Sequence, residues 1–147
     1  MLLFVGILAA AALCVGIVCV VRYVWQPRRW RATLSDPYYE LTRTGFKSLE
    51  GRRNFDKWKY MRSGDIIEFS HATNAQQPSF SRVIRKRHVF MSFREALQHF
   101  ERMGQLHRML PNVDSVEEGV AVYAKFVSLG TQVRDGVVIL ELGAAPL

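Results

Sequence analysis

Three charged residues close together in the sequence are the first candidates for chemistry: Lys47, Glu50 and Arg52. In a regular strand Glu50 and Arg52 share a face, and Lys47 points to the other, so a bend at Ser48 or Gly51 is needed to bring all three into one cleft. There, Lys47 and Arg52 would grip a phosphate or a base edge, and Glu50 would accept a hydrogen bond from an exocyclic amine. The alternative is a structural ion pair.

A segment that alternates basic and aromatic side chains follows directly. Cations that track a backbone and rings that stack on bases suit single-stranded nucleic acid. The alternative is that Phe55 and Trp58 are buried in a small core while the charges are solvated. The segment contains Arg52, Arg53, Phe55, Lys57, Trp58, Lys59, Tyr60 and Arg62.

Several kinds of site have no support in the sequence. The four histidines, His71, His88, His99 and His107, lack the spacing of paired metal ligands, and no nucleophile elbow or phosphate-binding loop is present. Both cysteines, Cys14 and Cys19, lie in an apolar N-terminal segment, so a cysteine-based zinc site is not expected elsewhere. We therefore expect no cofactor and no metal.

The elements that position these residues begin after a long apolar run. Residues 2–21 carry no charge and are long enough for a helix that crosses a bilayer. A cleaved signal peptide is the rival, but no Lys or Arg precedes the apolar run. Arg22, Arg28, Arg29 and Arg31 follow it, which predicts a single-pass membrane protein whose C-terminal domain faces the cytoplasm. The predicted organisation is an anchor at 1–23, a basic juxtamembrane linker at 24–34 and a domain at 35–147.

The positive charge is concentrated next to this segment. Residues 22–62 contain eleven Lys and Arg against four acidic residues, whereas residues 63–147 contain nine of each. Four of the eleven are the arginines near the predicted anchor. The remainder lies around residues 47–62 and is what would attract a polyanion.

The domain reads as a mixture of short strands and helices. The sequence predicts a helix that begins at Asp36 and Pro37, two helices that open with capping boxes at Ser92 and Ser115, and a buried strand at 136–142. Glycines at 45, 104 and 130 are expected to close the helices. Extended segments are predicted at 47–53, 66–70 and 81–90, with a turn at 63–65. The pattern predicts an α+β class and a small mixed barrel.

Several motifs in one order resemble the ASCH (activating signal cointegrator homology) domain of the PUA-like superfamily. Residues 45–52 read G-x-K-x-x-E-x-R, and residues 63–69 read SGDIIEF. Residues 90–93 (FMSF), 110–112 (LPN), 115–119 (SVEEG) and 136–138 (GVV) resemble later family motifs. The resemblance covers roughly residues 35–142.

The resemblance implies a small PUA-like β-barrel with flanking helices and a cleft that binds RNA or a modified nucleotide. Some small members resemble amidohydrolases of N4-acylated cytidine that use a Lys and a Thr. Lys47 matches the Lys, but Glu50 stands where the Thr is expected. The alternative function is therefore an amidohydrolase of N4-acylated cytidine, with Lys47 and Glu50 as its catalytic candidates. The nucleic-acid-binding candidates are Lys47, Glu50, Arg52, Arg53, Trp58 and Lys59.

A membrane-tethered protein-interaction module is the remaining hypothesis. Small residues in the apolar run allow close approach of a second helix, so a partner would bind through the predicted anchor. These residues are Gly6, Gly16 and the run from Ala9 to Ala12.

Overall fold

The computed structural model describes residues 26–145 of the chain. The predicted anchor at 1–23 lies outside these residues. Within residues 26–145, no helix combines the length and the apolar character needed to cross a membrane.

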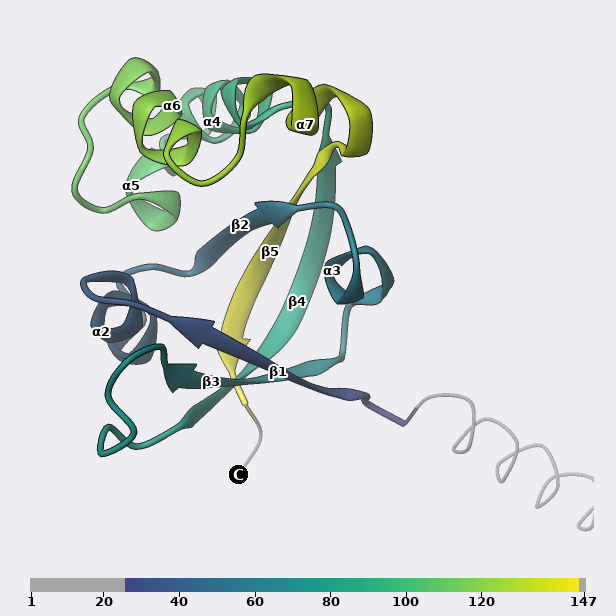
Figure 1. The fold of residues 1–147 in the computed structure, drawn as a ribbon, viewed down its shortest axis with the longest axis vertical. Helices are drawn as coiled ribbons and strands as arrows, with labels where there is room; N and C mark the ends of the chain where they lie inside the picture. The colour runs from purple at the N-terminus through teal and green to yellow at the C-terminus, as the bar shows by residue number, and fades with distance from the viewer. Residues whose placement is uncertain (1–25, 146–147) are drawn as a thin grey trace, which may run out of the picture.

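A curled sheet forms the framework of the molecule. Its five strands lie in the order β1-β3-β4-β5-β2, with β1 and β3 parallel and the other neighbours antiparallel. Figure 1 shows the sheet wrapping into a half-barrel, with β1 and β2 as its two edges. The strands are β1 (Arg29–Leu34), β2 (Leu49–Arg53), β3 (Ile66–His71), β4 (Phe80–Phe90) and β5 (Val137–Ala144).

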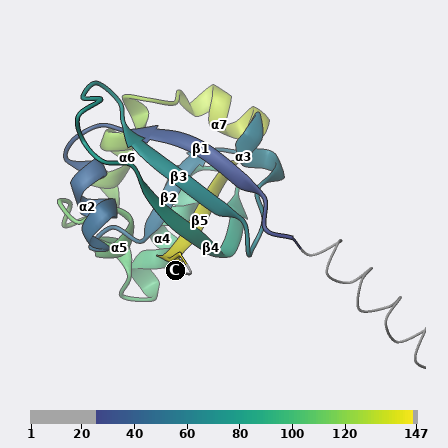
Figure 2. The same cartoon turned by 90° about the horizontal axis from the view of Figure 1, so that it is seen from below.

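The helices fall into separate groups around this sheet. Helices α4 to α7 gather on one side in Figure 1, with α2 and α3 beside the half-barrel. Seen from below in Figure 2, strands β1, β3 and β4 lie side by side across the front of the molecule. The helices are α2 (Tyr38–Thr44), α3 (Lys57–Tyr60), α4 (Phe93–Arg102), α5 (Leu106–Met109), α6 (Val116–Ala124) and α7 (Leu129–Asp135). The architecture is α+β, as expected. The curled sheet is compatible with a PUA-like fold, although it is a half-barrel rather than a complete barrel.

Strand β5 separates two hydrophobic clusters. Val137 and Ile139 belong to the cluster that α4 and α6 cover, whereas Val138, Leu140 and Leu142 belong to the cluster inside the half-barrel. Alternate side chains of a strand point to opposite faces, so one continuous apolar run serves both clusters. This explains why the predicted final strand is buried on both sides.

Strand β1 differs from the expectation of a linker over residues 24–34. Arg29 to Leu34 pair in parallel with Ile66 to His71. Ala32 and Leu34 point into the half-barrel core, and the indole nitrogen of Trp30 donates to buried Asp65 at 2.8 Å. Trp30 is therefore part of the folded domain.

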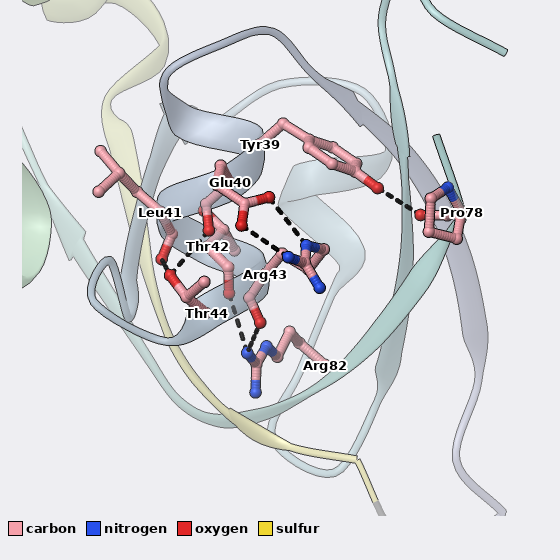
Figure 3. A network of polar contacts seen from close by, with 8 residues as sticks. All are labelled: Tyr39, Glu40, Leu41, Thr42, Arg43, Thr44, Pro78 and Arg82. Atoms are coloured by element: carbon pink, nitrogen blue, oxygen red, sulfur yellow. Dashed lines mark hydrogen bonds and ion pairs between the residues drawn. The ribbon is translucent and has the colours of Figure 1, made fainter. Parts of the chain in front are cut away.

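Helix α2 is held in place by polar contacts near both of its ends (Figure 3). The Arg82 guanidinium donates to the carbonyl oxygens of Thr42 at 2.9 Å and Arg43 at 2.7 Å, and the Tyr39 hydroxyl donates to the Pro78 carbonyl. Gly45 ends the helix with φ of 89°, a conformation that favours glycine. Asp36 does not cap the helix as predicted, because its carboxylate contacts His71 instead.

Both predicted serine caps are present. The hydroxyl of Ser92 accepts from the Glu95 backbone, and that of Ser115 accepts from the Glu118 backbone. In a capping box the glutamate side chain accepts from the backbone amide of the capping serine. Here the Glu95 carboxylate accepts from the Met91 amide instead, one residue before Ser92. The prediction that glycine 130 closes a helix is wrong, because this residue lies inside α7.

Candidate functional site

A pocket of about 630 Å³ lies where the two edges of the half-barrel face the helices. We call it the seam pocket. Its walls come from β1, β2 and their flanking loops on one side and from α4 and α6 with the segment after α6 on the other. The lining residues are Thr33, Leu34, Ser35, Asp36, Tyr38, Lys47, Glu50, Gly51, Arg52, Arg53, Phe55, Asp56, Trp58, Ala72, Phe93, Leu110, Val122, Tyr123, Phe126 and Val127.

An ion-paired triad lies at the buried end of this pocket. Lys47 and Glu50 are 4% and 3% exposed, and the Lys47 Nζ lies 3.3 Å from the Glu50 Oε2. The Arg52 Nε donates to the Glu50 Oε1 at 2.7 Å. Lys47 precedes β2, so it is outside the regular strand alternation that would have separated it from Glu50. The structure thus brings the three predicted residues together.

The ammonium of Lys47 is fully engaged. It donates to the carbonyl oxygens of Leu49 at 2.6 Å and Met109 at 2.7 Å, and the Glu50 carboxylate takes the third direction. An ammonium has three donors, so none remains for a phosphate. Lys47 therefore positions Glu50 and joins β2 to α5, which is the structural role named as the alternative, and its role in ligand binding stays a prediction.

The protonation states follow from burial and pairing. Burial lowers the pKa of Lys47, and the neighbouring Glu50 charge opposes this effect. Burial alone would raise the pKa of Glu50, but the charges of Lys47 and Arg52 outweigh it and hold that pKa below its ordinary value. Glu50 is therefore an ionised carboxylate at neutral pH.

Two arginines stacked on aromatic rings lie along β2. The guanidinium carbon of Arg52 is 4.8 Å from the centroid of the Trp58 ring, and that of Arg53 is 4.2 Å from the Phe55 ring. Both arginine side chains are 32% exposed. Arg53 also pairs with Asp135 of α7. These cations keep part of their surface open to solvent at the rim of the pocket.

Side-chain contacts across the gap between β1 and β2, which we call the seam, hold these two edge strands near each other. The Arg52 guanidinium donates to the Thr33 carbonyl at 3.2 Å, and the Lys57 ammonium donates to the Arg31 carbonyl. Side chains from β2 and α3 thus satisfy backbone acceptors of β1 that have no neighbouring strand. The seam is bridged by side chains rather than by backbone pairing.

The predicted binding residues are not all in one place. Arg52, Arg53 and Trp58 join Lys47 and Glu50 in lining the seam pocket, whereas Lys59 does not line it. Lys59 is exposed on α3, and its carbonyl is near the Arg87 guanidinium. Trp58 packs against the half-barrel cluster, and the Arg52 guanidinium lies over its ring, so its predicted stacking on a base stays a prediction.

Tyr123 and Phe93 are pocket residues that sequence reasoning missed. Their rings stack with centroids 3.8 Å apart and an interplanar angle of 4°. A Cβ atom built on Gly51 would lie 2.6 Å from the Tyr123 hydroxyl, so only glycine lets α6 approach β2 this closely. Tyr123 occupies the apolar face of its helix, and its hydroxyl was the one signal that distinguished it from a core residue.

Metal ligands are not grouped in the part of the chain that the structure describes. Within residues 26–145, no cluster of three or more His, Cys, Asp or Glu side chains has a geometry that could hold a metal ion. Two of the histidines make local hydrogen bonds instead, His71 with Asp36 at 3.1 Å and His88 with Glu141 at 2.7 Å.

Comparison with known proteins finds solved structures of the same fold. No protein-family model and no curated protein sequence matches the chain. The crystal structure of the hypothetical protein PH0355 matches with 32% sequence identity and a TM-score of 0.66, over 80% of this chain and 99% of that one. The solution structure of protein PF0455 from Pyrococcus furiosus matches with 29% identity and a TM-score of 0.61, over 81% and 99%.

Proposed function

We propose that this chain, which belongs to the same family as the hypothetical protein PH0355, binds single-stranded RNA or a modified nucleotide in the seam pocket. The observation that carries the proposal is the composition of that pocket. An ionised, buried carboxylate lies among aromatic walls, and partly exposed arginines lie at the rim.

Each part of the pocket has a counterpart in a nucleotide. The partly buried rings of Tyr38 and Trp58 line the pocket and offer surface for a base. Glu50 offers an acceptor to a base edge. Arg53 has donors left for a phosphate, since only its Nε is engaged by Asp135.

The resemblance to ASCH domains supports the same proposal independently. The residues of the G-x-K-x-x-E-x-R motif, Lys47, Glu50 and Arg52, form the triad at the buried end of the pocket. We propose on this basis that the domain is ASCH-like.

Hydrolysis of N4-acylated cytidine is the second candidate, because Lys47 and Glu50 meet in the pocket. Two features favour binding over hydrolysis. The Lys47 donors are already occupied, and the ionised Glu50 accepts from Arg52. A Lys that serves as a base or nucleophile needs a free amine.

The binding proposal predicts a measurable effect of Arg53. We expect the full chain, purified in a neutral detergent, to bind a fluorescent RNA of about 12 nucleotides in an anisotropy titration, with affinity that falls as salt rises. Arg53→Gln should weaken binding and lower the slope of log affinity against log salt by about 0.7, the value for one phosphate contact on a single strand.

Arg94→Gln is the matched control, because Arg94 is an exposed, ion-paired arginine of α4 that does not line the pocket. Its affinity and salt slope should equal those of the parent chain. Absence of binding at low salt to several RNAs of different sequence would refute the proposal. If the salt slope of the Arg53 variant equals that of the parent chain, Arg53 makes no phosphate contact, and that part of the proposal is refuted.

A further inference from the structure

The Tyr123 hydroxyl is a buried polar group with no assigned task. Tyr123 is 8% exposed, lines the seam pocket, and its hydroxyl makes no hydrogen bond to any residue in 26–145. Buried hydroxyl groups are nearly always satisfied, so an unpartnered one at a pocket wall indicates a group held for a ligand. The stack on Phe93 and the close approach to Gly51 fix its position over β2.

A second atom with hydrogen-bonding capacity left belongs to Glu50, the residue before Gly51. The Glu50 Oε1 accepts from Arg52, and the Oε2 has only the ion pair with the Lys47 ammonium, 3.3 Å away, among residues 26–145. A carboxylate oxygen has two acceptor directions, so the Oε2 keeps one for a donor in the pocket.

The two groups have opposite hydrogen-bonding roles. Burial, and then the negative charge of Glu50, raise the pKa of the Tyr123 hydroxyl well above its ordinary value, so this hydroxyl is neutral and can donate. Lys47 and Arg52 keep Glu50 ionised, so it can only accept. A ligand that satisfies both must offer a donor to Glu50 and an acceptor to Tyr123.

We infer that Tyr123 is a specificity-determining residue, which with the Glu50 Oε2 selects a planar ring that carries an N–H donor beside a hydrogen-bond acceptor. The partly buried rings of Tyr38 and Trp58, which also line the pocket, favour a planar ligand. The inference deepens the proposed function, since nucleobases have such edges, and the site would equally accept a simple cyclic amide.

The two halves of this selection are tested with 2-pyridone, whose N–H lies beside its carbonyl, and N-methyl-2-pyridone, which lacks the donor. Both are titrated into the full chain in neutral detergent and followed by ligand-observed NMR. We expect the parent chain to bind 2-pyridone about 10-fold more tightly, because the methylated ring leaves Glu50 without a donor. Tyr123→Phe keeps the ring stack and should weaken 2-pyridone binding by about 3- to 10-fold.

Tyr60→Phe is the matched control, since Tyr60 is an exposed tyrosine that does not line the pocket. Its affinity for 2-pyridone should equal that of the parent. The melting temperature of the Tyr123 variant should be unchanged or raised, whereas removal of a purely structural hydroxyl bond would lower it.

Equal binding of the two pyridones, no binding of either one, or undiminished binding by Tyr123→Phe would each overturn the inference. The preference of the parent chain for 2-pyridone needs no variant, so it also decides the case in which Tyr123→Phe fails to fold. If RNA and nucleotides do not bind while 2-pyridone does with the expected preference, the proposed function fails and the inference stands.

Discussion

At the scale of single residues, Lys47 is a buried charge whose partners all lie within the protein. Its ammonium donates to the carbonyl oxygens of Leu49, two residues away, and of Met109, 62 residues away, and faces the Glu50 carboxylate. A buried pair of this kind contributes little net stability compared with apolar residues, but loss of one partner is costly because the other charge is left uncompensated. The value of Lys47 lies in the fixed position and charge of Glu50.

Lys47→Met tests this view. The substitution removes the ammonium, leaves Glu50 with Arg52 alone, and strips the Leu49 and Met109 carbonyls of their side-chain donor. We expect the free energy of unfolding to fall by about 3–5 kcal/mol, measured by urea unfolding of the full chain. Arg94→Gln breaks the exposed pair with Glu117 and should leave the unfolding midpoint unchanged. Equal midpoints for the Lys47 variant and the parent would contradict the prediction.

At the scale of elements, the contact between β2 and α6 decides the shape of the pocket. Gly51 lies under the stacked rings of Tyr123 and Phe93, where an added Cβ would approach their atoms to 2.6 Å and 3.1 Å. Those rings belong to the packed hydrophobic cluster, so they have little room to retreat.

Gly51→Ala should therefore push the helices away from β2. We expect a loss of about 1–3 kcal/mol in the free energy of unfolding, as for other overpacked sites, together with weaker RNA binding. Gly130→Ala is the matched change in α7, where a Cβ would meet open space, and it should be neutral or stabilising by up to about 1 kcal/mol. Calorimetry of the two variants measures these changes in stability. An unchanged free energy of unfolding for Gly51→Ala would contradict the prediction and show that the helices move without cost.

Much of the element pattern could be predicted because it depends on local signals. The Ser92 and Ser115 caps and the apolar run of β5 are encoded by neighbouring residues, and the structure confirms them. Strand β1 could not be predicted in this way. Its parallel pairing with β3 joins residues 37 positions apart, and its arginines resemble the flank of an apolar segment.

The candidate site was predictable in part for the same reason. Lys47, Glu50 and Arg52 are close in sequence, and one bend before β2 brings them together. Tyr123 reaches the pocket only through the packing of α6 on β2, and no short motif signals such a contact. The hydrogen bond from Lys47 to the Met109 carbonyl spans 62 positions, and no short motif signals it either.

At the scale of the whole molecule, the chain combines a folded domain with an apolar N-terminal run. Strand β1 begins at Arg29, and the Arg28 backbone amide donates to Asp65 at 3.1 Å, so the domain is ordered almost to the point where it meets that run. The predicted anchor and its small-residue stripe lie outside the described residues. We propose that residues 2–21 attach the domain to a membrane with the domain on the cytoplasmic side.

Membrane fractionation tests this proposal. The full chain should remain in the pellet after alkaline carbonate extraction, whereas a variant that lacks residues 1–25 should move to the supernatant. A C-terminal epitope should be open to protease on the cytoplasmic face. Mass spectrometry of the membrane-bound chain should give the full mass, and a shortened N-terminus would support a cleaved signal peptide instead.

Strand β5 determines how the domain unfolds. It supplies side chains to both hydrophobic clusters and pairs with β2 on one edge and β4 on the other. The helical side therefore cannot lose its packing without exposing residues that also complete the half-barrel. We expect the domain to open as a single cooperative unit, with the β5 amides exchanging their hydrogens only when the whole domain unfolds.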